Sequence, residues 1–92
     1  MSGCIYKIYS LSGNCCYIGK TTKPCRKTRF SQHKWEYKRG RYYYTSYEVL
    51  KYPDAEFEIL EDNIPDLELI EREKEYMRNE ENVVNLSGMK YN

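Results

Sequence analysis

The chain has 92 residues, of which 40% are hydrophobic and 32% are charged, and its formal net charge is +1. This length predicts a single domain over residues 1–92, and the composition is ordinary for a globular protein. No apolar run approaches the roughly 18 residues of a membrane-spanning helix, and the first residues lack the pattern of a secretory signal. The sequence therefore predicts an intracellular protein of the cytoplasm or nucleus and excludes a membrane-spanning class.

Two β-rich segments open the chain. Residues 4–9 and 15–18 are rich in β-branched and aromatic side chains, and residues 10–14 between them are typical of a turn. This pattern predicts a β-hairpin. Pairing across the turn would bring Tyr6 close to Tyr17, and two neighbouring phenols on a small sheet are the first indication of a site.

Thr21 or Thr22 is predicted to cap a first helix, which tolerates Pro24 in its first turn and stops at Gly40. A face that only packed against a core would hold aromatic residues alone. At about 100° per residue, one face of this helix instead collects two arginines, two aromatic residues and the single histidine of the chain. These residues are Arg26, Arg29, Phe30, His33 and Tyr37.

Residues 45–59 predict a short helix followed by a strand. The helix begins at Thr45 or Ser46 and ends near Leu50, ahead of Pro53. Residues 55–59 alternate apolar and acidic side chains with period two, which is typical of a strand with one solvated face. This is the third predicted strand of the chain.

A third helix is predicted from Asn63 to about Asn79. Carboxylates are seldom buried unless they are paired or bind a metal. Glu73, however, lies in the middle of the apolar stripe of this helix, so it is either the partner of a salt bridge to Arg26 or Arg29 or the ligand of a cation. The apolar members of the stripe are Leu69, Ile70, Tyr76 and Met77.

Charges are distributed unevenly along the chain. Residues 20–41 contain nine basic side chains and one acidic one, a balance of +8, whereas residues 54–82 contain twelve acids and three bases, a balance of −9. A basic segment of this density suits a polyanion such as DNA, and an acidic half would orient the bound polymer by repulsion. Charge alone fits two solvated helix faces equally well. The candidate contacts to nucleic acid are Lys20, Arg26, Lys34 and Arg41.

Two local motifs that suggest other chemistry fail on spacing. Gly19-Lys20-Thr21 resembles the end of a phosphate-binding loop, but that loop needs a glycine five residues before Gly19, where Asn14 stands. The four cysteines lack the spacing of a zinc site and are interpreted as reduced packing residues. They are Cys4, Cys15, Cys16 and Cys25.

The candidate site residues supply the chemical groups that phosphodiester hydrolysis requires: a carboxylate, a guanidinium, phenols and an imidazole. A cation held by Glu73 can polarise a phosphate, and the guanidinium of Arg29 can offset the charge of its oxygens. A phenol or an imidazole can position or deprotonate a water molecule. A single carboxylate suggests a single metal whose octahedral shell is completed by water and phosphate oxygens, as is typical of magnesium.

These residues together resemble the motifs of the GIY-YIG nuclease family. The two halves of the family motif correspond to Cys4-Ile5-Tyr6 and Tyr17-Ile18-Gly19, and three further elements follow in the family's order and spacing: residues 29–33, residues 70–73 and Val84-Asn85. The resemblance implies an α+β fold, with a small three-stranded antiparallel sheet flanked by three or more helices. It also implies metal-dependent cleavage of DNA, with Mg²⁺ or Mn²⁺ as cofactor.

The resemblance implies a role for each residue of the site. Glu73 would be the metal ligand, Arg29 would stabilise the phosphate, and His33 would form a hydrogen bond within the site. Tyr17 or Tyr6 would contact the attacking water, with one of them as a candidate general base.

Other positions support the site or depart from the family pattern. Asn85 resembles a late asparagine that supports the geometry of the site. Gly19 would let the chain turn closely past the site where Tyr17 ends the second strand, and Lys20 would stand at the mouth. Cys4 replaces the glycine of the first half, a change expected to alter packing at a strand edge.

The region after the first helix departs further from the family. Some relatives carry a second histidine there, whereas this chain has only His33, and Tyr42 or a neighbour occupies the region. Residues 42–44 are all tyrosines and lie beside Arg39 and Arg41, so they would either contact nucleic acid by stacking or pack at a helix junction.

The leading hypothesis is a minimal, magnesium-dependent DNA endonuclease without a separate targeting domain. The alternative is a catalytically silent DNA-binding module on the same fold, and a third hypothesis is an interaction domain whose charged halves meet a protein partner. Selectivity for particular DNA would then come from a homodimer or from a targeting partner protein. Loss of cleavage in the Glu73→Ala variant would separate the first hypothesis from the other two.

Overall fold

The computed structural model describes residues 2–22, 26–40 and 45–84, with the side chains of residues 26 and 27 left out. These residues form three strands and three helices in the order expected from the sequence. The elements are β1 (Ser2–Ser10), β2 (Cys15–Thr21), α1 (Arg26–Arg39), α2 (Tyr47–Leu50), β3 (Glu56–Pro65) and α3 (Asp66–Asn79).

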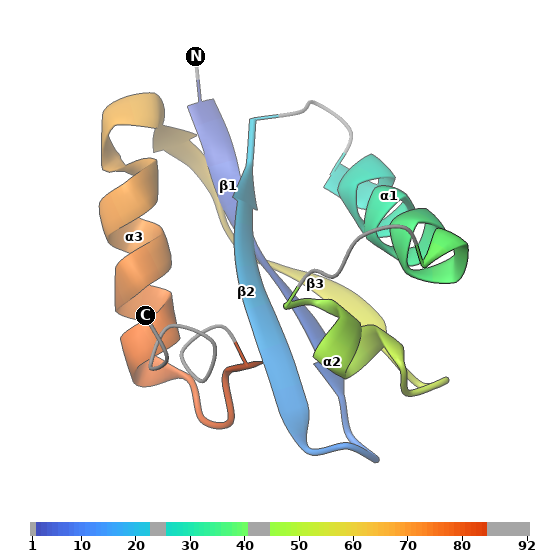
Figure 1. Cartoon of the computed structure of the whole chain (residues 1–92). Coiled ribbons are helices and arrows are strands. Elements are labelled where there is room, and N and C mark those ends of the chain that lie inside the picture. Colours follow the sequence, from blue (N-terminus) through green and yellow to red (C-terminus); the bar gives the residue numbers. More distant parts are fainter. Residues whose placement is uncertain (1, 23–25, 41–44, 85–92) are drawn as a thin grey trace.

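The strands form one antiparallel sheet with the order β2-β1-β3, so β1 is the central strand. Helix α3 covers one face of the sheet, while α1 and α2 lie on the other face (Figure 1). This is the α+β fold with a three-stranded antiparallel sheet that the sequence predicted. Cys4 is fully buried on the central strand, so the packing change expected there is in the core and not at a strand edge.

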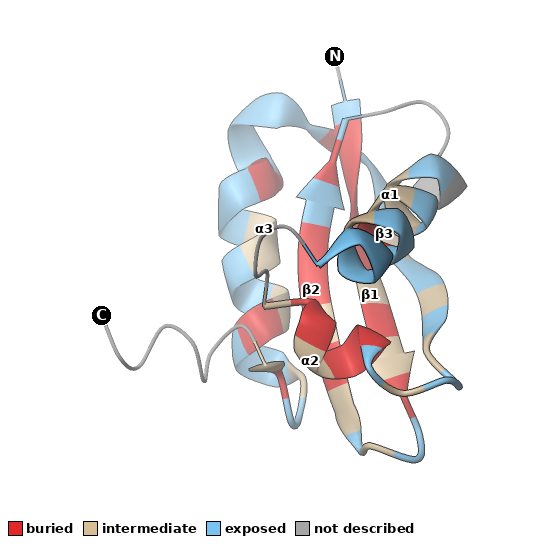
Figure 2. Cartoon of the chain, turned by 45° about the vertical axis from the view of Figure 1, so that its right-hand side comes forward, coloured by how far each residue is buried: buried red, intermediate tan, exposed pale blue. Residues whose placement is uncertain are grey.

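Each face of the sheet has its own hydrophobic cluster, because successive side chains of a strand point to opposite faces. Ile5 packs on the α3 face with Ile18, Ile64, Leu69 and Met77. On the other face, Tyr6 and Ile8 pack with Tyr47, Val49 and Leu50 of α2. Figure 2 shows this buried layer along the strands, with the outward sides of α1 and α3 exposed.

The cysteines that the structure describes pack as the sequence predicted. Cys4 is fully buried, and Cys16 is 4% exposed within the cluster on the α3 face. Cys15 is partly buried against the cluster on the opposite face. Adjacent cysteines on one strand therefore serve two different cores, while Cys25 lies outside the described residues.

Strand β2 is longer than predicted. Thr21 was expected as a candidate cap of the first helix, but it is the last residue of β2 and pairs with Cys4. Thr21 is 8% exposed, and its neighbour across the sheet is fully buried. Continued pairing with the central strand therefore outweighs the capping preference of threonine at this position.

Strand β3 is also longer than the predicted residues 55–59. It continues through Asn63 to Pro65, where the sequence had predicted the start of the third helix, and α3 begins only at Asp66. Its pairing with β1 shifts register on either side of Ile5, and Asn63 has a positive φ of 57°. This irregularity lets Ile64 enter the core, where it is 2% exposed.

The helix ends agree better with the sequence. The predicted stop at Gly40 is confirmed by its positive φ of 62°, and Ser46 precedes α2 as predicted. Within α3, Leu69 and Met77 are buried, whereas Ile70 is 55% exposed and the prediction that it belongs to the core stripe is wrong. Ile70 lies about 100° around the helix from Leu69, on a flank that the narrow sheet leaves uncovered.

Among the residues described, no helix combines the length and the apolar character needed to cross a membrane.

Candidate functional site

Two tyrosines lie at the centre of the site, on the face of the sheet that α1 and α2 cover. Tyr6 pairs with Gly19 in the β1–β2 ladder, and Tyr17 pairs with Ile8. The ring centroids of Tyr6 and Tyr17 are 6.4 Å apart. The predicted proximity of the two phenols is therefore confirmed.

Gly19 has a different role from the predicted one. It lies inside β2, which continues two residues further, so the chain does not turn there and Tyr17 does not end the strand. A Cβ atom built on Gly19 would collide with Cζ and Oη of Tyr6. The absence of a side chain at this position allows the ring of Tyr6 to lie flat across the neighbouring strand.

Helix α1 delivers two polar side chains to the hydroxyl of Tyr6. The Oη atom of Tyr6 lies 2.9 Å from Nε2 of His33, within hydrogen-bonding distance. Arg29 Nε donates a hydrogen bond of 3.3 Å to the same oxygen. Because Arg29 and His33 are four residues apart, they lie on one face of the helix, as the sequence predicted.

The second nitrogen of His33 is held by a serine at the start of α2. His33 Nδ1 lies 2.9 Å from Oγ of Ser46, which is fully buried. Burial and the nearby Arg29 lower the pKa of His33 to about 4, so the imidazole is neutral at neutral pH. A neutral imidazole donates through one nitrogen and accepts through the other, so it links Tyr6 to Ser46 in either tautomer.

Ser46 and an aromatic wall were missed as site components. The sequence suggested Ser46 only as a helix start, and no local pattern marks it as the partner of a histidine thirteen residues away. Phe57 of β3 lies 5.3 Å from the ring of Tyr6 and stacks on Phe30 of α1 at 5.4 Å between centroids. These rings close the site on its β3 side and exclude water from Tyr6.

The surroundings keep both phenols protonated. Burial raises the pKa of Tyr6, and the neighbouring Tyr17 raises it further. Burial also raises the pKa of Tyr17, followed by the negative charge of Glu73. The two hydroxyls are therefore hydrogen-bonding groups at neutral pH and carry no charge of their own.

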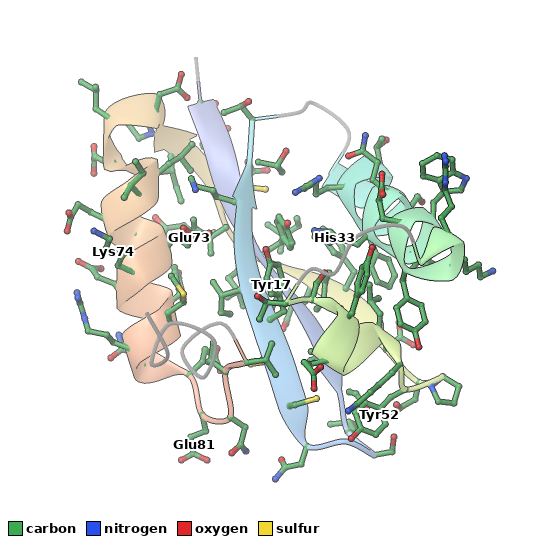
Figure 3. All side chains as sticks on the ribbon, in the orientation of Figure 1. Tyr17, His33, Tyr52, Glu73, Lys74 and Glu81 are labelled. Atoms are coloured by element: carbon green, nitrogen blue, oxygen red, sulfur yellow. The ribbon has the colours of Figure 1, made fainter. Side chains whose placement is uncertain are left out.

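Glu73 approaches from the opposite face of the sheet. Figure 3 shows it between α3 and β2, with Tyr17 and His33 on the other side of that strand. Its Oε1 atom lies 3.4 Å from Nζ of Lys20, and the two side chains are 17% and 41% exposed. Among the described side chains, the partner of Glu73 is thus Lys20. The sequence had suggested Arg26 or Arg29, and of these Arg29 does not pair with Glu73 within the described side chains.

The position of β2 in the sheet explains how two faces contribute to one site. Because β2 is an edge strand, Glu73 and Tyr17 lie on opposite faces of the strand that borders the sheet, and the outer edge of this strand pairs with Val83 at Cys16. The carboxylate is close enough to raise the pKa of the Tyr17 phenol by its charge. The polar cluster and the carboxylate therefore belong to one candidate site.

The donor set at this edge suits a cation that takes few protein ligands. Within the described ranges, no group of three or more histidine, cysteine, aspartate or glutamate side chains is arranged to hold a metal ion. Glu73 provides a single half-buried carboxylate that carries only a weak, partly exposed ion pair. Magnesium keeps several waters and binds one or two carboxylates together with phosphate oxygens, so these residues fit it.

Several predicted residues cannot be compared with the structure. Arg41, Asn85 and residues 42–44 lie outside the described residues, as does the side chain of Arg26. Lys34 is exposed on α1, and its Nζ atom lies 4.5 Å from the ring centroid of Phe30.

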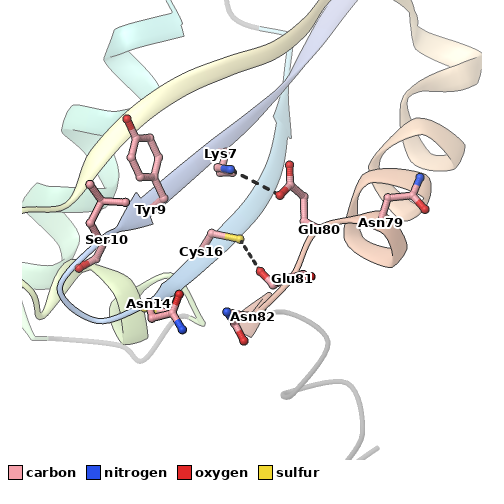
Figure 4. A pocket seen from close by; sticks show the side chains of 11 residues that line it. Lys7, Tyr9, Ser10, Asn14, Cys16, Asn79, Glu80, Glu81 and Asn82 are labelled. Carbon is pink, nitrogen blue, oxygen red and sulfur yellow. Dashed lines mark hydrogen bonds and ion pairs between the residues drawn. The ribbon is translucent and has the colours of Figure 1, made fainter.

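A separate polar cavity of about 350 Å³ lies at the hairpin end of the sheet (Figure 4). It opens on the α3 side of the sheet, where Lys7 and Glu80 form an ion pair of 3.5 Å. The thiol of Cys16 lies 3.6 Å from the carbonyl oxygen of Glu81. These contacts tie the end of α3 to the sheet, and the lining of the cavity does not include Tyr6 or Tyr17.

The family model described as the GIY-YIG catalytic domain matches residues 2–92. No curated protein and no solved structure gives a significant match to the chain.

Proposed function

Since this chain belongs to the GIY-YIG family of nucleases, we propose that it is a metal-dependent DNA endonuclease whose 92 residues form a single catalytic domain. The observation that supports this proposal most directly is the buried network around Tyr6. The phenol oxygen is shared by Arg29 and His33, and a half-buried carboxylate lies across the adjacent sheet edge. Networks with strongly shifted pKa values and satisfied hydrogen bonds cluster at catalytic sites.

Glu73 would hold one divalent cation, Mg²⁺ or Mn²⁺, which when bound would polarise the phosphate and stabilise the departing oxygen. Lys20, now 3.4 Å from the carboxylate, would be released to contact a phosphate of the DNA. The pair is weak and partly solvated, so its loss costs little.

Arg29 would offset the negative charge that accumulates on the phosphate oxygens during hydrolysis. Its Nε atom is held by Tyr6, and Nη1 donates a hydrogen bond of 3.4 Å to Gln32. These two contacts limit the motion of the guanidinium before DNA arrives. A preorganised cation needs less rearrangement in the transition state than a mobile one.

The phenols of Tyr6 and Tyr17 would have different roles. Tyr6 is fully buried and its oxygen already contacts Arg29 and His33, so we assign it to holding those residues in place. Tyr17 is only partly buried and lies nearer to the charge of Glu73, so we assign it to contacting the attacking water. His33 is a positioning residue, because a base with a pKa of about 4 holds a proton weakly at neutral pH. Asn85 completes the proposed site on the strength of the sequence motif alone.

The alternative is a catalytically silent module that binds DNA through α1. The presence of both phenols, Arg29, His33 and Glu73 disfavours it, because a module that only bound DNA would need neither the buried histidine nor the carboxylate. Such a module would bind DNA with strong salt dependence and would leave it intact with any divalent metal.

A cleavage assay separates these alternatives. The protein is incubated with supercoiled, linear and branched DNA in the presence of Mg²⁺ or Mn²⁺, with and without a chelator. We expect cleavage that the chelator removes and that the Glu73→Gln substitution lowers by at least about 100-fold. Glu75→Gln, an exposed acid on the same helix, is the control and should cleave normally. Undiminished cleavage by Glu73→Gln would refute the assignment, and binding without cleavage would favour the silent module.

A further inference from the structure

The outward face of α1 carries an aromatic ring that no core explains. Trp35 is the only tryptophan of the chain and is 55% exposed. It lies two residues after His33, which places it on the opposite side of the helix from the buried network. More than half of the surface of this residue therefore stays accessible to a ligand.

The surroundings of Trp35 are cationic. The guanidinium of Arg39 lies 4.4 Å from the centroid of the indole ring, and Lys38 adds a second positive charge in the last turn of the helix. The first turn of α1 contains no acidic residue. The one acidic residue of the whole helix, Glu36, is partly buried. An aromatic ring among cations is complementary to a nucleic acid strand, which presents both bases and phosphates.

A polar flank of α1 lies between Trp35 and the catalytic cluster, because Gln32 and Arg39 fall between Arg29 and Trp35 around the helix. Arg29 contacts Gln32 three residues later, and the same stripe reaches Arg39 after seven more residues. At 1.5 Å per residue the stripe extends about 15 Å, which corresponds to about four nucleotide steps of one DNA strand. A DNA strand whose phosphate is cleaved beside Arg29 could therefore run along α1 to the indole ring of Trp35.

We propose that Trp35 and Arg39 form a stacking platform for an unpaired base of the DNA strand that enters the catalytic site. The platform would capture single-stranded segments, because a base in an intact duplex already has both faces stacked on its neighbours. The enzyme would then favour DNA with unpaired nucleotides near the cleavage point. This inference rests on the proposed function, since it assigns the kind of DNA that the same site receives.

Intrinsic fluorescence tests the platform directly, because all tryptophan emission of this chain comes from residue 35. The Glu73→Gln variant is titrated with a single-stranded oligonucleotide, with the matching duplex, and with the same duplex carrying a bulged base. We expect strong quenching by the single strand and the bulged duplex, and weak quenching by the intact duplex. Equal quenching by all three, or quenching by none, overturns the proposal.

Binding of the labelled single strand, followed by fluorescence anisotropy, provides a second measurement. Trp35→Ala should weaken binding about tenfold, whereas Trp35→Phe should keep most of the affinity because it retains a stacking face. Leu67→Ala is the matched control, since Leu67 is 96% exposed but lies on α3. Equal affinity for all variants, or self-association of the wild-type protein that Trp35→Ala removes, overturns the proposal.

The two proposals can fail separately. If cleavage depends on Glu73 but DNA does not quench the fluorescence of Trp35, the nuclease assignment is supported and the platform is overturned. Quenching by single strands without any cleavage supports the platform and refutes the nuclease assignment.

Discussion

The two faces of the sheet are built from the same three strands but differ in chemistry. On the α3 face, Ile5 and Leu69 belong to an aliphatic cluster, and a carboxylate, Glu73, lies near the edge strand β2. On the α1 face, the buried layer contains hydrogen-bonded polar groups, with Tyr6 and His33 at its centre. The first face is mainly an apolar core, whereas the second combines an apolar core with polar atoms that burial orients.

The alternation of the central strand makes this division possible. Ile5 and Tyr6 are adjacent and both fully buried, yet they serve opposite faces. A polar site can therefore be packed as tightly as a core without interrupting the core itself. Substitutions in the aliphatic cluster of the α3 face should change stability, and those in the polar cluster of the α1 face should change activity.

The largest expected effect is on catalysis, at the α1 face. Arg29→Ala removes the cation beside Tyr6 and should lower cleavage by about 100- to 1000-fold, because charge on the phosphate is then uncompensated. Arg72→Ala is the matched control on α3, where the guanidinium pairs with Glu61 at 2.8 Å. Initial rates of plasmid nicking measure both variants. Similar losses in the two would show that general electrostatics, and not the position of Arg29, governs the rate.

The aliphatic cluster of the α3 face should respond in stability alone. Leu69 is 5% exposed within the aliphatic cluster, so Leu69→Ala should lower the free energy of unfolding by about 3 kcal/mol through lost burial and a residual cavity. Urea denaturation measures the change. Cleavage per folded molecule should stay close to that of the wild type, and a selective loss of activity would contradict the division between faces.

The buried histidine makes stability depend on pH. The pKa of His33 is about 4 in the folded chain, below the ordinary histidine value of 6.5, so the unfolded chain binds more protons between these two values. Stability should therefore be full above pH 6.5 and should fall by about 3 kcal/mol as the pH falls to 4. Urea denaturation at several pH values, compared with His33→Gln, measures this contribution. Parallel pH profiles for the two proteins would refute it.

The smallest expected effect comes from crowding Tyr6. Gly19→Ala would force the tyrosine ring away from β2 and weaken its contacts with Arg29 and His33. We expect a loss of about 1–3 kcal/mol in stability, together with reduced cleavage per folded molecule. Gly13→Ala, where the added Cβ would meet the ring of Tyr52 instead, should lower stability only. Equal activity of the two variants would show that the position of Tyr6 is not critical.

Local patterns were sufficient for the elements and for part of the site. Turn residues and helix stops act over a few positions, so the hairpin and the end of α1 at Gly40 could be predicted. Tyr6 and Tyr17 were placed together because hairpin pairing is local, and Arg29 and His33 because one helical turn separates them. The family motif, read from the same residues, is confirmed by the match over residues 2–92.

Contacts between distant segments were decided only by the tertiary structure. The partner of Glu73 is Lys20, 53 positions earlier, and one of the two partners of His33 is Ser46, which the sequence marks only as a helix start. The exposure of Ile70 and the extension of β3 to Pro65 likewise depend on what the sheet covers. Sequence patterns report the period of each element, whereas burial and pairing across elements depend on how those elements pack in three dimensions.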